Sequence, residues 1–296
     1  MSAEPADDLV ALISDWYTAH ARDLPWRRPA TSPWAVLVSE VMLQQTPVAR
    51  VAPVFEAWME RWPDAGALAA AAPADVIRAW GRLGYPRRAL RLHQCAVAIV
   101  DGYDGQVPAD VDALLSLPGI GAYTARAVAT FAFGQRHAVV DINVRRVVAR
   151  AVHGRAEAGP ASVRRDLDDV DALLPPSDDA AALASVALME LGAVVCTAAR
   201  PACADCPVRR QCRWRTAGYP VSTGPRARRQ AFTGTDRQVR GLLLAVLRDE
   251  PEPVRRATLD AVWPEATQRG RALISLVADG LVAALPDGRF ALPQHR

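Results

Sequence analysis

The chain has 296 residues, of which 51% are hydrophobic and 23% charged, and its formal net charge is +3. This is the composition of a globular protein long enough for about two domains. No apolar run approaches the roughly 18 residues of a membrane span, and the acidic N-terminus lacks a secretory signal pattern, so we expect a cytoplasmic protein. All 35 positive charges are arginines, so no lysine amine can form a Schiff base with a sugar aldehyde.

Hydrophobic periodicity predicts an all-α fold for the first two-thirds of the chain, because strands and helices do not alternate there. Turns rich in Pro, Gly and Asp separate the predicted helices. These are expected at residues 7–20, 32–46, 48–61, 73–82, 86–102, 109–116, 122–133, 142–152, 161–174 and 178–195.

The final part of the chain has a different pattern. Residues 213–235 are rich in Gly, Pro and Arg, which indicates a basic linker. It is either a solvated tether or a segment whose arginines (Arg226, Arg228 and Arg229) contact phosphates. Beyond it, helices are predicted at 236–250, 256–264 and 266–280, and a hairpin within 281–293 around Asp287 and Gly288. Three helices and a hairpin suggest a small winged-helix-like module.

The segment 32–46, SPWAVLVSEVMLQQT, is apolar on nearly all sides yet carries Glu40 near its centre. Ser32 suits the start of a helix, so a buried helix is predicted. Glutamate is rarely buried without a partner. Either Glu40 pairs with a buried arginine, such as Arg22 or Arg27, or its burial serves a chemical purpose.

Four of the five cysteines lie close together in residues 196–212. Their C-x6-C-x2-C-x5-C spacing favours one 4Fe–4S cluster, which takes one thiolate per iron from a compact loop. A structural zinc is the alternative, although the stretch has a single CxxC and no histidine. Four unrelated thiols are a weaker alternative, and Cys95 is expected to be a buried small hydrophobe. The predicted ligands are Cys196, Cys203, Cys206 and Cys212.

The stretch LPGIGAYTARAVATFAFG, residues 117–134, places a glycine turn between the helices expected at 109–116 and 122–133. In such a turn the backbone N–H groups around Gly119 and Gly121 can bind a phosphate without reading a base. Glycine turns between helices are common, so this signal alone is moderate.

In AVVDINVRRVVAR, residues 138–150, an apolar run delivers Asp141 to the start of a helix. The simplest interpretation is an N-cap. A capping aspartate beside the positive end of a helix also stays ionised, so it could stabilise a developing cation.

Five motifs, SEVMLQQT, GLGYPRRA, LPGIGAYTA, VVDINVRR and the four-cysteine loop, occur in this order. Together they resemble the adenine DNA glycosylases of the MutY family, in the helix–hairpin–helix glycosylase superfamily, over roughly residues 5–215. The resemblance implies a mainly α core at 1–215, with a six-helix part at about 24–135 and a cluster part at 1–23 plus 136–215. The pattern beyond it predicts a linker at 216–235 and the winged-helix-like domain at 236–296.

Such enzymes flip a base out of the duplex and cut its N-glycosidic bond. The resemblance makes Glu40 the acid that protonates adenine at N7, since burial raises a carboxyl pKa and holds the proton. It makes Asp141 the carboxylate that stabilises the oxocarbenium-like sugar, with Asn143 to position it. Tyr123 occupies the position of the lysine in the lyase branch, which implies a monofunctional enzyme. Tyr123 is expected to contact Asp141 or the flipped nucleotide.

Other residues match the family more loosely. Trp26 and Arg27 match its adenine-pocket segment. Gln45 and Tyr85 match residues that wedge into the base stack around the orphan base and so reduce the cost of base flipping.

Residues 236–296 are too short for the Nudix-like domain that many family members carry. We expect this segment to clamp duplex DNA, with residues 266–280 as the contacting helix, and to sense 8-oxoguanine. The alternative is a domain that only packs against the core or a partner. Its arginines include Arg237, Arg240, Arg269 and Arg271.

The sequence thus predicts a nucleoid-associated, monomeric adenine DNA glycosylase of base excision repair, with double-stranded DNA as its partner. It would remove adenine mispaired with 8-oxoguanine or guanine. One alternative is a thymine or uracil mismatch glycosylase of the same fold, against which Glu40 argues because pyrimidines have no N7. The other is a non-catalytic DNA-binding iron–sulfur protein, which would leave Glu40 and Asp141 unexplained.

Overall fold

The computed structural model describes residues 4–222 and 232–294. Its contacts divide the chain into two compact units. Unit 1 comprises residues 1–37, 109–116 and 120–226, and unit 2 comprises residues 38–108, 117–119 and 227–296. In the described ranges, no helix is long and apolar enough to cross a membrane.

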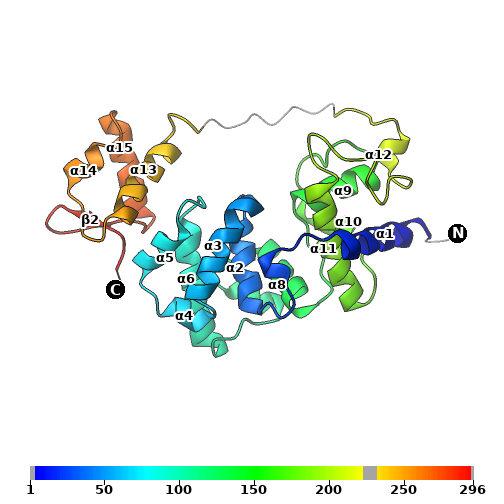
Figure 1. Cartoon of the computed structure of the whole chain (residues 1–296), viewed down its shortest axis with the longest axis horizontal. Helices are drawn as coiled ribbons and strands as arrows, with labels where there is room; N and C mark the ends of the chain where they lie inside the picture. Colours follow the sequence, from blue (N-terminus) through cyan, green and yellow to red (C-terminus); the bar gives the residue numbers. More distant parts are fainter. Residues whose placement is uncertain (1–3, 223–231, 295–296) are drawn as a thin grey trace. The chain divides into compact units, whose positions relative to one another are not determined.

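Unit 1 is built around α11 (Asp178–Val194), which packs against α1, α8 and α9 (Figure 1). Ala184, Leu188 and Leu191 of α11 are buried, so this helix forms the centre of the unit's core. Burial of such apolar side chains contributes roughly 25 cal/mol per Å² of area removed from water. The other elements described in this unit are α1 (Glu4–His20), η1 (Pro25–Arg27), α7 (Val111–Ser116), α8 (Ala122–Phe133), α9 (Ile142–Ala151), α10 (Val163–Asp171) and α12 (Arg213–Thr216).

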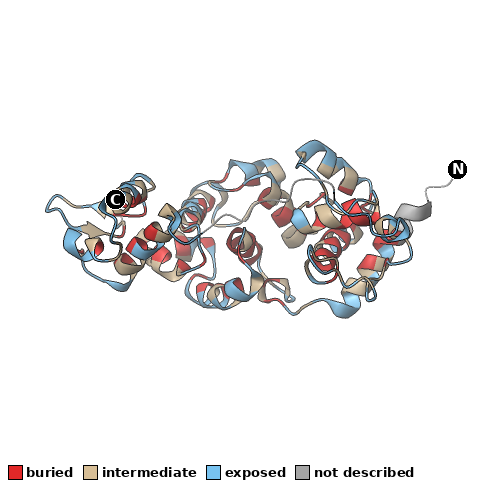
Figure 2. Cartoon of the chain, turned by 90° about the horizontal axis from the view of Figure 1, so that it is seen from above, coloured by how far each residue is buried: buried red, intermediate tan, exposed pale blue. Residues whose placement is uncertain are grey.

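Helix α2 (Pro33–Leu43) begins in unit 1 and ends in unit 2. Unit 2 continues with α3 (Val48–Arg61), α4 (Ala65–Ala69), α5 (Pro73–Trp80) and α6 (Arg87–Tyr103). Trp58 packs edge-on against Trp62 and Trp80, with ring centroids 4.7 and 5.6 Å apart. In both units the buried residues lie on the faces that the helices turn toward their neighbours (Figure 2).

The end of the chain forms three helices and a hairpin, as its pattern predicts. These are α13 (Asp236–Asp249), α14 (Arg256–Asp260), α15 (Ala266–Ala278), β1 (Ala283–Ala284) and β2 (Phe290–Ala291). The two strands pair antiparallel, and Gly288 in the turn has a φ of 81°. The core of this segment includes Ala74 and Ile77 of α5, so the C-terminal segment packs against the helices that precede it in unit 2.

The predicted helices are confirmed along the described chain, with ends that differ by a few residues. Three short elements, η1, α4 and α12, were not predicted, because each is too short to show a period. The side chain of Asp64 caps α4 by accepting from Ala67 N at 2.8 Å. Helix α12 occupies the start of the predicted linker, whereas residues 223–231, with Arg226, Arg228 and Arg229, lie outside the described residues.

Candidate active site

Glu40 is buried in α2, with 7% of its surface exposed, as the sequence predicts. Ser32 caps the helix by accepting from Ala35 N at 3.2 Å. Leu37 and Met42 beside Glu40 on the same helix are fully buried. Glu40 is therefore a carboxyl group largely removed from solvent, on a helix whose neighbouring buried side chains are mostly apolar.

The arginines suggested as partners of Glu40, Arg22 and Arg27, both bind Glu190 of α11. Arg22 donates from Nε at 2.5 Å and from Nη2 at 2.8 Å, and Arg27 donates from Nη1 at 2.8 Å. Burial alone would raise the pKa of Glu190, but the two arginines outweigh it and lower that pKa to about 2. Arg22 and Arg27 lie on either side of Trp26 in the sequence, and Trp26 is buried in η1.

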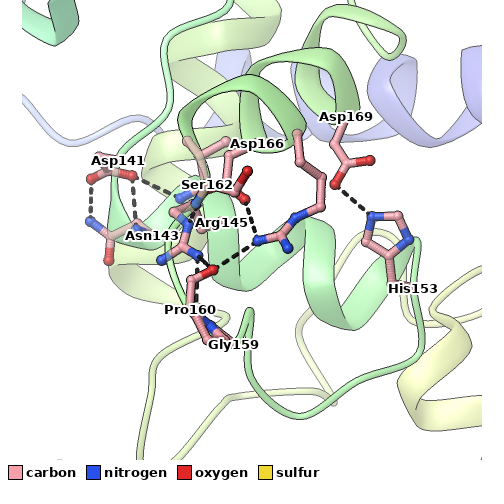
Figure 3. A network of polar contacts seen from close by, with 11 residues as sticks. Asp141, Asn143, Arg145, His153, Gly159, Pro160, Ser162, Asp166 and Asp169 are labelled. Carbon is pink, nitrogen blue, oxygen red and sulfur yellow. Dashed lines mark hydrogen bonds and ion pairs between the residues drawn. The ribbon is translucent and has the colours of Figure 1, made fainter.

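Asp141 is the N-cap of α9, as predicted. Its Oδ1 accepts from the backbone N–H groups of Asn143 at 2.8 Å and Val144 at 2.7 Å, and its Oδ2 accepts from Asn143 Nδ2 at 2.7 Å (Figure 3). Burial raises the pKa of Asp141 above its ordinary value, although these hydrogen bonds and the charge of Arg146 oppose the rise. The carboxylate is thus fixed in direction, with Asn143 as its positioning partner.

Arg145 fastens the start of α9 to the segment before α10. Its Nε donates to Asp166 Oδ2 at 2.8 Å, and its Nη2 donates to the carbonyls of Gly159 and Pro160, each at 3.1 Å (Figure 3). Arg145 and Asp166 are both largely buried. This pairing holds the helix that carries Asp141.

Arg146 links the same helix to the cysteine loop. It donates to Asn143 Oδ1 at 2.7 Å, to the Gly192 carbonyl at 2.7 Å and to the Cys196 carbonyl at 2.6 Å. A Cβ atom at Gly192 would lie 2.7 Å from Asn143 Cβ, so only glycine allows this close approach of α9 and α11. Sequence reasoning missed Arg146, although it lies within the VVDINVRR motif.

The predicted hairpin is present as α7, a glycine turn and α8. Gly119 has a φ of 82°, and a Cβ atom there would lie 2.9 Å from Arg91 Cβ, so the turn requires glycine. Gly121 is the N-cap of α8 and offers no capping side chain, which leaves the helix start open to an outside acceptor. Tyr123 lies half-buried in the first turn of α8.

Gln45 and Tyr85 share an unusual backbone conformation, with φ values of 54° and 48° in the left-handed region. Both are exposed. Arg88, which sequence reasoning missed although it lies in GLGYPRRA, connects the two turns. Its guanidinium donates to the carbonyls of Val41, Gln44 and Gly84 at 2.8, 2.6 and 3.3 Å. Burial lowers the pKa of Arg88 to about 10.

The four clustered cysteines are half-buried, and their thiols are close enough to influence one another electrostatically. Burial, with a smaller effect of the other three thiols, raises the pKa of Cys206 to about 11. Arg150 donates to Cys196 Sγ at 3.5 Å, and Cys212 Sγ donates to the Arg150 carbonyl at 3.7 Å.

In the described residues, no three His, Cys, Asp or Glu side chains are grouped as ligands of a single metal ion. A 4Fe–4S cluster places each thiolate on a different iron, so its four sulfurs need not converge on one point. The loop offers four thiols and no histidine, and Arg150 lies beside one of the thiols. These are ligands of the chemical type that a 4Fe–4S cluster takes. Cys95 is fully buried in α6, as expected of a small hydrophobe.

Several known proteins resemble this chain in sequence or in fold. The model of the HhH-GPD superfamily base excision DNA repair protein matches residues 38–170. An adenine DNA glycosylase of Mycolicibacterium smegmatis is 64% identical over 96% of this chain and 95% of that protein. A thymine/uracil-DNA glycosylase of Pyrobaculum aerophilum is 33% identical over 66% of this chain and 86% of that protein. The structure of a thermostable thymine-DNA glycosylase superposes with a TM-score of 0.65 at 24% identity, covering 72% of this chain and 98% of that one.

The helical fold with its hairpin turn is thus that of an HhH-GPD base excision DNA glycosylase, a hydrolase of N-glycosyl bonds. The chain belongs to the adenine DNA glycosylase family.

Proposed function

We propose that the protein is a monofunctional adenine DNA glycosylase that acts on double-stranded DNA and removes adenine paired with 8-oxoguanine or guanine. The observation that supports the proposal is the burial of Glu40 in α2, a helix whose other buried side chains are mostly apolar. A thymine or uracil glycosylase would have no N7 for such an acid to protonate.

In this mechanism Glu40 donates a proton to N7 of the flipped adenine, which makes the base a better leaving group. The C1′–N9 bond then breaks and leaves positive charge on the sugar. Asp141 stabilises that charge, because three hydrogen bonds hold its carboxylate in one orientation. A water molecule adds to the sugar and leaves an abasic site.

The absence of lysine supports the monofunctional assignment, since the lyase reaction of related enzymes uses an amine. Tyr123 takes the corresponding position in α8. Its role is to contact Asp141 or the flipped nucleotide, and a phenol there cannot form a Schiff base.

Cys196, Cys203, Cys206 and Cys212 would hold one 4Fe–4S cluster, which supplies structure rather than chemistry to the reaction. Their shared loop and the absence of nitrogen donors within it support the assignment. Since Arg146 ties the Cys196 carbonyl to α9, ordering of the loop would help to hold the helix that presents Asp141.

The predicted division into a core at 1–215, a linker at 216–235 and a winged-helix-like domain at 236–296 remains part of this proposal. The three helices and hairpin at the end of the chain support it. The enzyme is expected to act as a monomer, with the hairpin turn at Gly119 and Gly121 binding a phosphate of the duplex and Trp26 and Arg27 bordering the adenine pocket.

Base excision on duplexes that contain A:8-oxoguanine, A:G, T:G or U:G tests the proposal. We expect adenine release from the first two and none from the others, without strand cleavage until alkali is added. Release of thymine or uracil in place of adenine would replace the proposal by the mismatch-glycosylase alternative. Duplex binding without any excision would favour the non-catalytic alternative.

A further inference from the structure

The arginines of the C-terminal segment are mostly paired with carboxylates of the same unit. On α15, Arg269 binds Asp260 and Arg271 binds Asp236, each at 2.7 Å. The remaining pairs are Arg240 with Asp279, Arg256 with Asp260 and Arg289 with Asp287. Helix α15, expected to contact DNA, therefore has its arginine charges largely neutralised by partners within unit 2.

Arg237 differs from these arginines. Its guanidinium lies 5.8 Å from the centroid of the Tyr85 ring and 5.2 Å from that of Phe232, and no carboxylate partner is found for it among the described residues. It stands in the first turn of α13, where the helix dipole does not favour a positive charge. All three side chains are exposed. Helix stability therefore does not explain an arginine here.

Several contacts hold α13 and its segment beside the turn that carries Tyr85. Arg248 donates to the Gly81 carbonyl, and Arg87 pairs with Asp279 at 3.2 Å. Helices α5 and α13 also contribute buried residues to one core. The position of Arg237 over Tyr85 thus follows from packing and from polar contacts at two further points.

The Tyr85 side chain is accessible to a partner outside the protein. It is 46% exposed and has a left-handed backbone, which is a strained conformation for a tyrosine. The guanidinium of Arg88 lies 5.3 Å from the same ring, but its hydrogen bonds to backbone carbonyls commit it to the fold. Of these two arginines beside the Tyr85 ring, the exposed Arg237 is the one available to contact a nucleic acid.

We propose that Arg237 is a positioning residue for Tyr85, and that Arg237, Tyr85 and Phe232 form one contact surface for the DNA strand opposite the excised adenine. Exposed aromatic rings with an adjacent guanidinium provide a stacking surface for an unpaired base and a charge for the neighbouring phosphate. The inference rests on the proposed function, because it assumes that Tyr85 wedges beside the orphan base. It assigns the recognition role of the C-terminal segment to the start of α13 rather than to α15.

A thermodynamic cycle between Arg237→Ala and Tyr85→Leu tests the inference. Binding is measured with full-length protein and a duplex that carries a non-cleavable 2′-fluoro-2′-deoxyadenosine opposite 8-oxoguanine. We expect Arg237→Ala to weaken binding about two- to fivefold, the size of an exposed cation–π contact. The same change on the Tyr85→Leu background should weaken binding little further, because the two residues act as a unit.

Arg255→Ala is the matched control, since it removes the same charge from an exposed position in the same segment without an aromatic contact among the described residues. It should leave both affinity and the salt dependence of binding unchanged, whereas Arg237→Ala should reduce the salt slope by up to about 0.9. Arg237→Lys, which keeps the charge but not the planar guanidinium, should restore the salt slope but only part of the affinity. Equal thermal unfolding midpoints identify variants that remain folded, and Arg237→Met replaces Arg237→Ala if the latter unfolds.

Independent effects of Arg237→Ala and Tyr85→Leu, or an equal effect of Arg255→Ala, would overturn the inference. Truncation is a poorer test, because removal of α13 would expose Ala74 and Ile77 of the shared core. Adenine excision by the wild-type protein reports on the proposed function by itself. If the wild type releases adenine and the two substitutions act independently, the role of Arg237 is refuted and the proposed function stands.

Discussion

Replacement of Glu190 by glutamine tests the ion-pair cluster that holds the Trp26 segment. Glu190 has no exposed side-chain surface, and its pKa is lowered from 4.5 to about 2. Each pKa unit corresponds to about 1.4 kcal/mol, so the charged form contributes on the order of 3 kcal/mol to stability near neutral pH. Arg22 is 36% exposed, so part of its charge is screened by solvent and the expected loss in Glu190→Gln is about 2–3 kcal/mol.

The assay is urea unfolding of wild type and Glu190→Gln between pH 7 and pH 3. Because the folded pKa is depressed, the contribution of Glu190 is complete above about pH 4.5 and declines as the pH falls toward about 2. The stability difference between the two proteins should therefore shrink over that interval. A difference that stays constant with pH, or one below about 0.5 kcal/mol at pH 7, would refute the assigned ion pairs.

Three other predictions concern the site and its supports. The acid limb of the pH profile of kcat/KM should lie above the range of an ordinary aspartate, because burial raises the pKa of Asp141; a limb in the ordinary range would contradict its role as the required anion. Cys206→Ser should lower the iron content well below four per chain and weaken duplex binding, as elemental analysis and a binding titration would show; zinc in the wild-type protein would refute the cluster. Arg88→Met should destabilise the protein by about 2–4 kcal/mol in urea unfolding, because it leaves buried carbonyls unpaired. An unchanged unfolding midpoint would show that Arg88 does not support the two turns.

The sequence predicts the helices well because their apolar periods are strong, and it predicts the Asp141 cap because capping is a local interaction. Glu40 and Glu190 show where such reasoning stops. Each is a carboxylate within an apolar stretch of helix, Glu40 in α2 and Glu190 near the end of α11, and only Glu40 was singled out. Arg22 lies 168 residues from Glu190 in the chain, so no local pattern could reveal that pair.

Arg88 and Arg146 are arginines whose structural partners could not be predicted from the sequence either. Both lie inside motifs that were recognised, yet their partners include backbone carbonyls up to fifty residues away in the chain. A carbonyl group is present at every residue, so composition and spacing carry no information about which one an arginine binds. Such contacts become visible only when the packing of the helices is known.

The most direct test of the account is the single-turnover rate of adenine release from an A:8-oxoguanine duplex by wild type and Glu40→Gln. Glutamine keeps the size of the side chain but cannot supply the proton. We expect the rate to fall by at least about a thousandfold, which corresponds to about 4 kcal/mol of transition-state stabilisation, with duplex binding retained. Adenine release by Glu40→Gln at the wild-type rate would contradict the assignment of Glu40 as the acid.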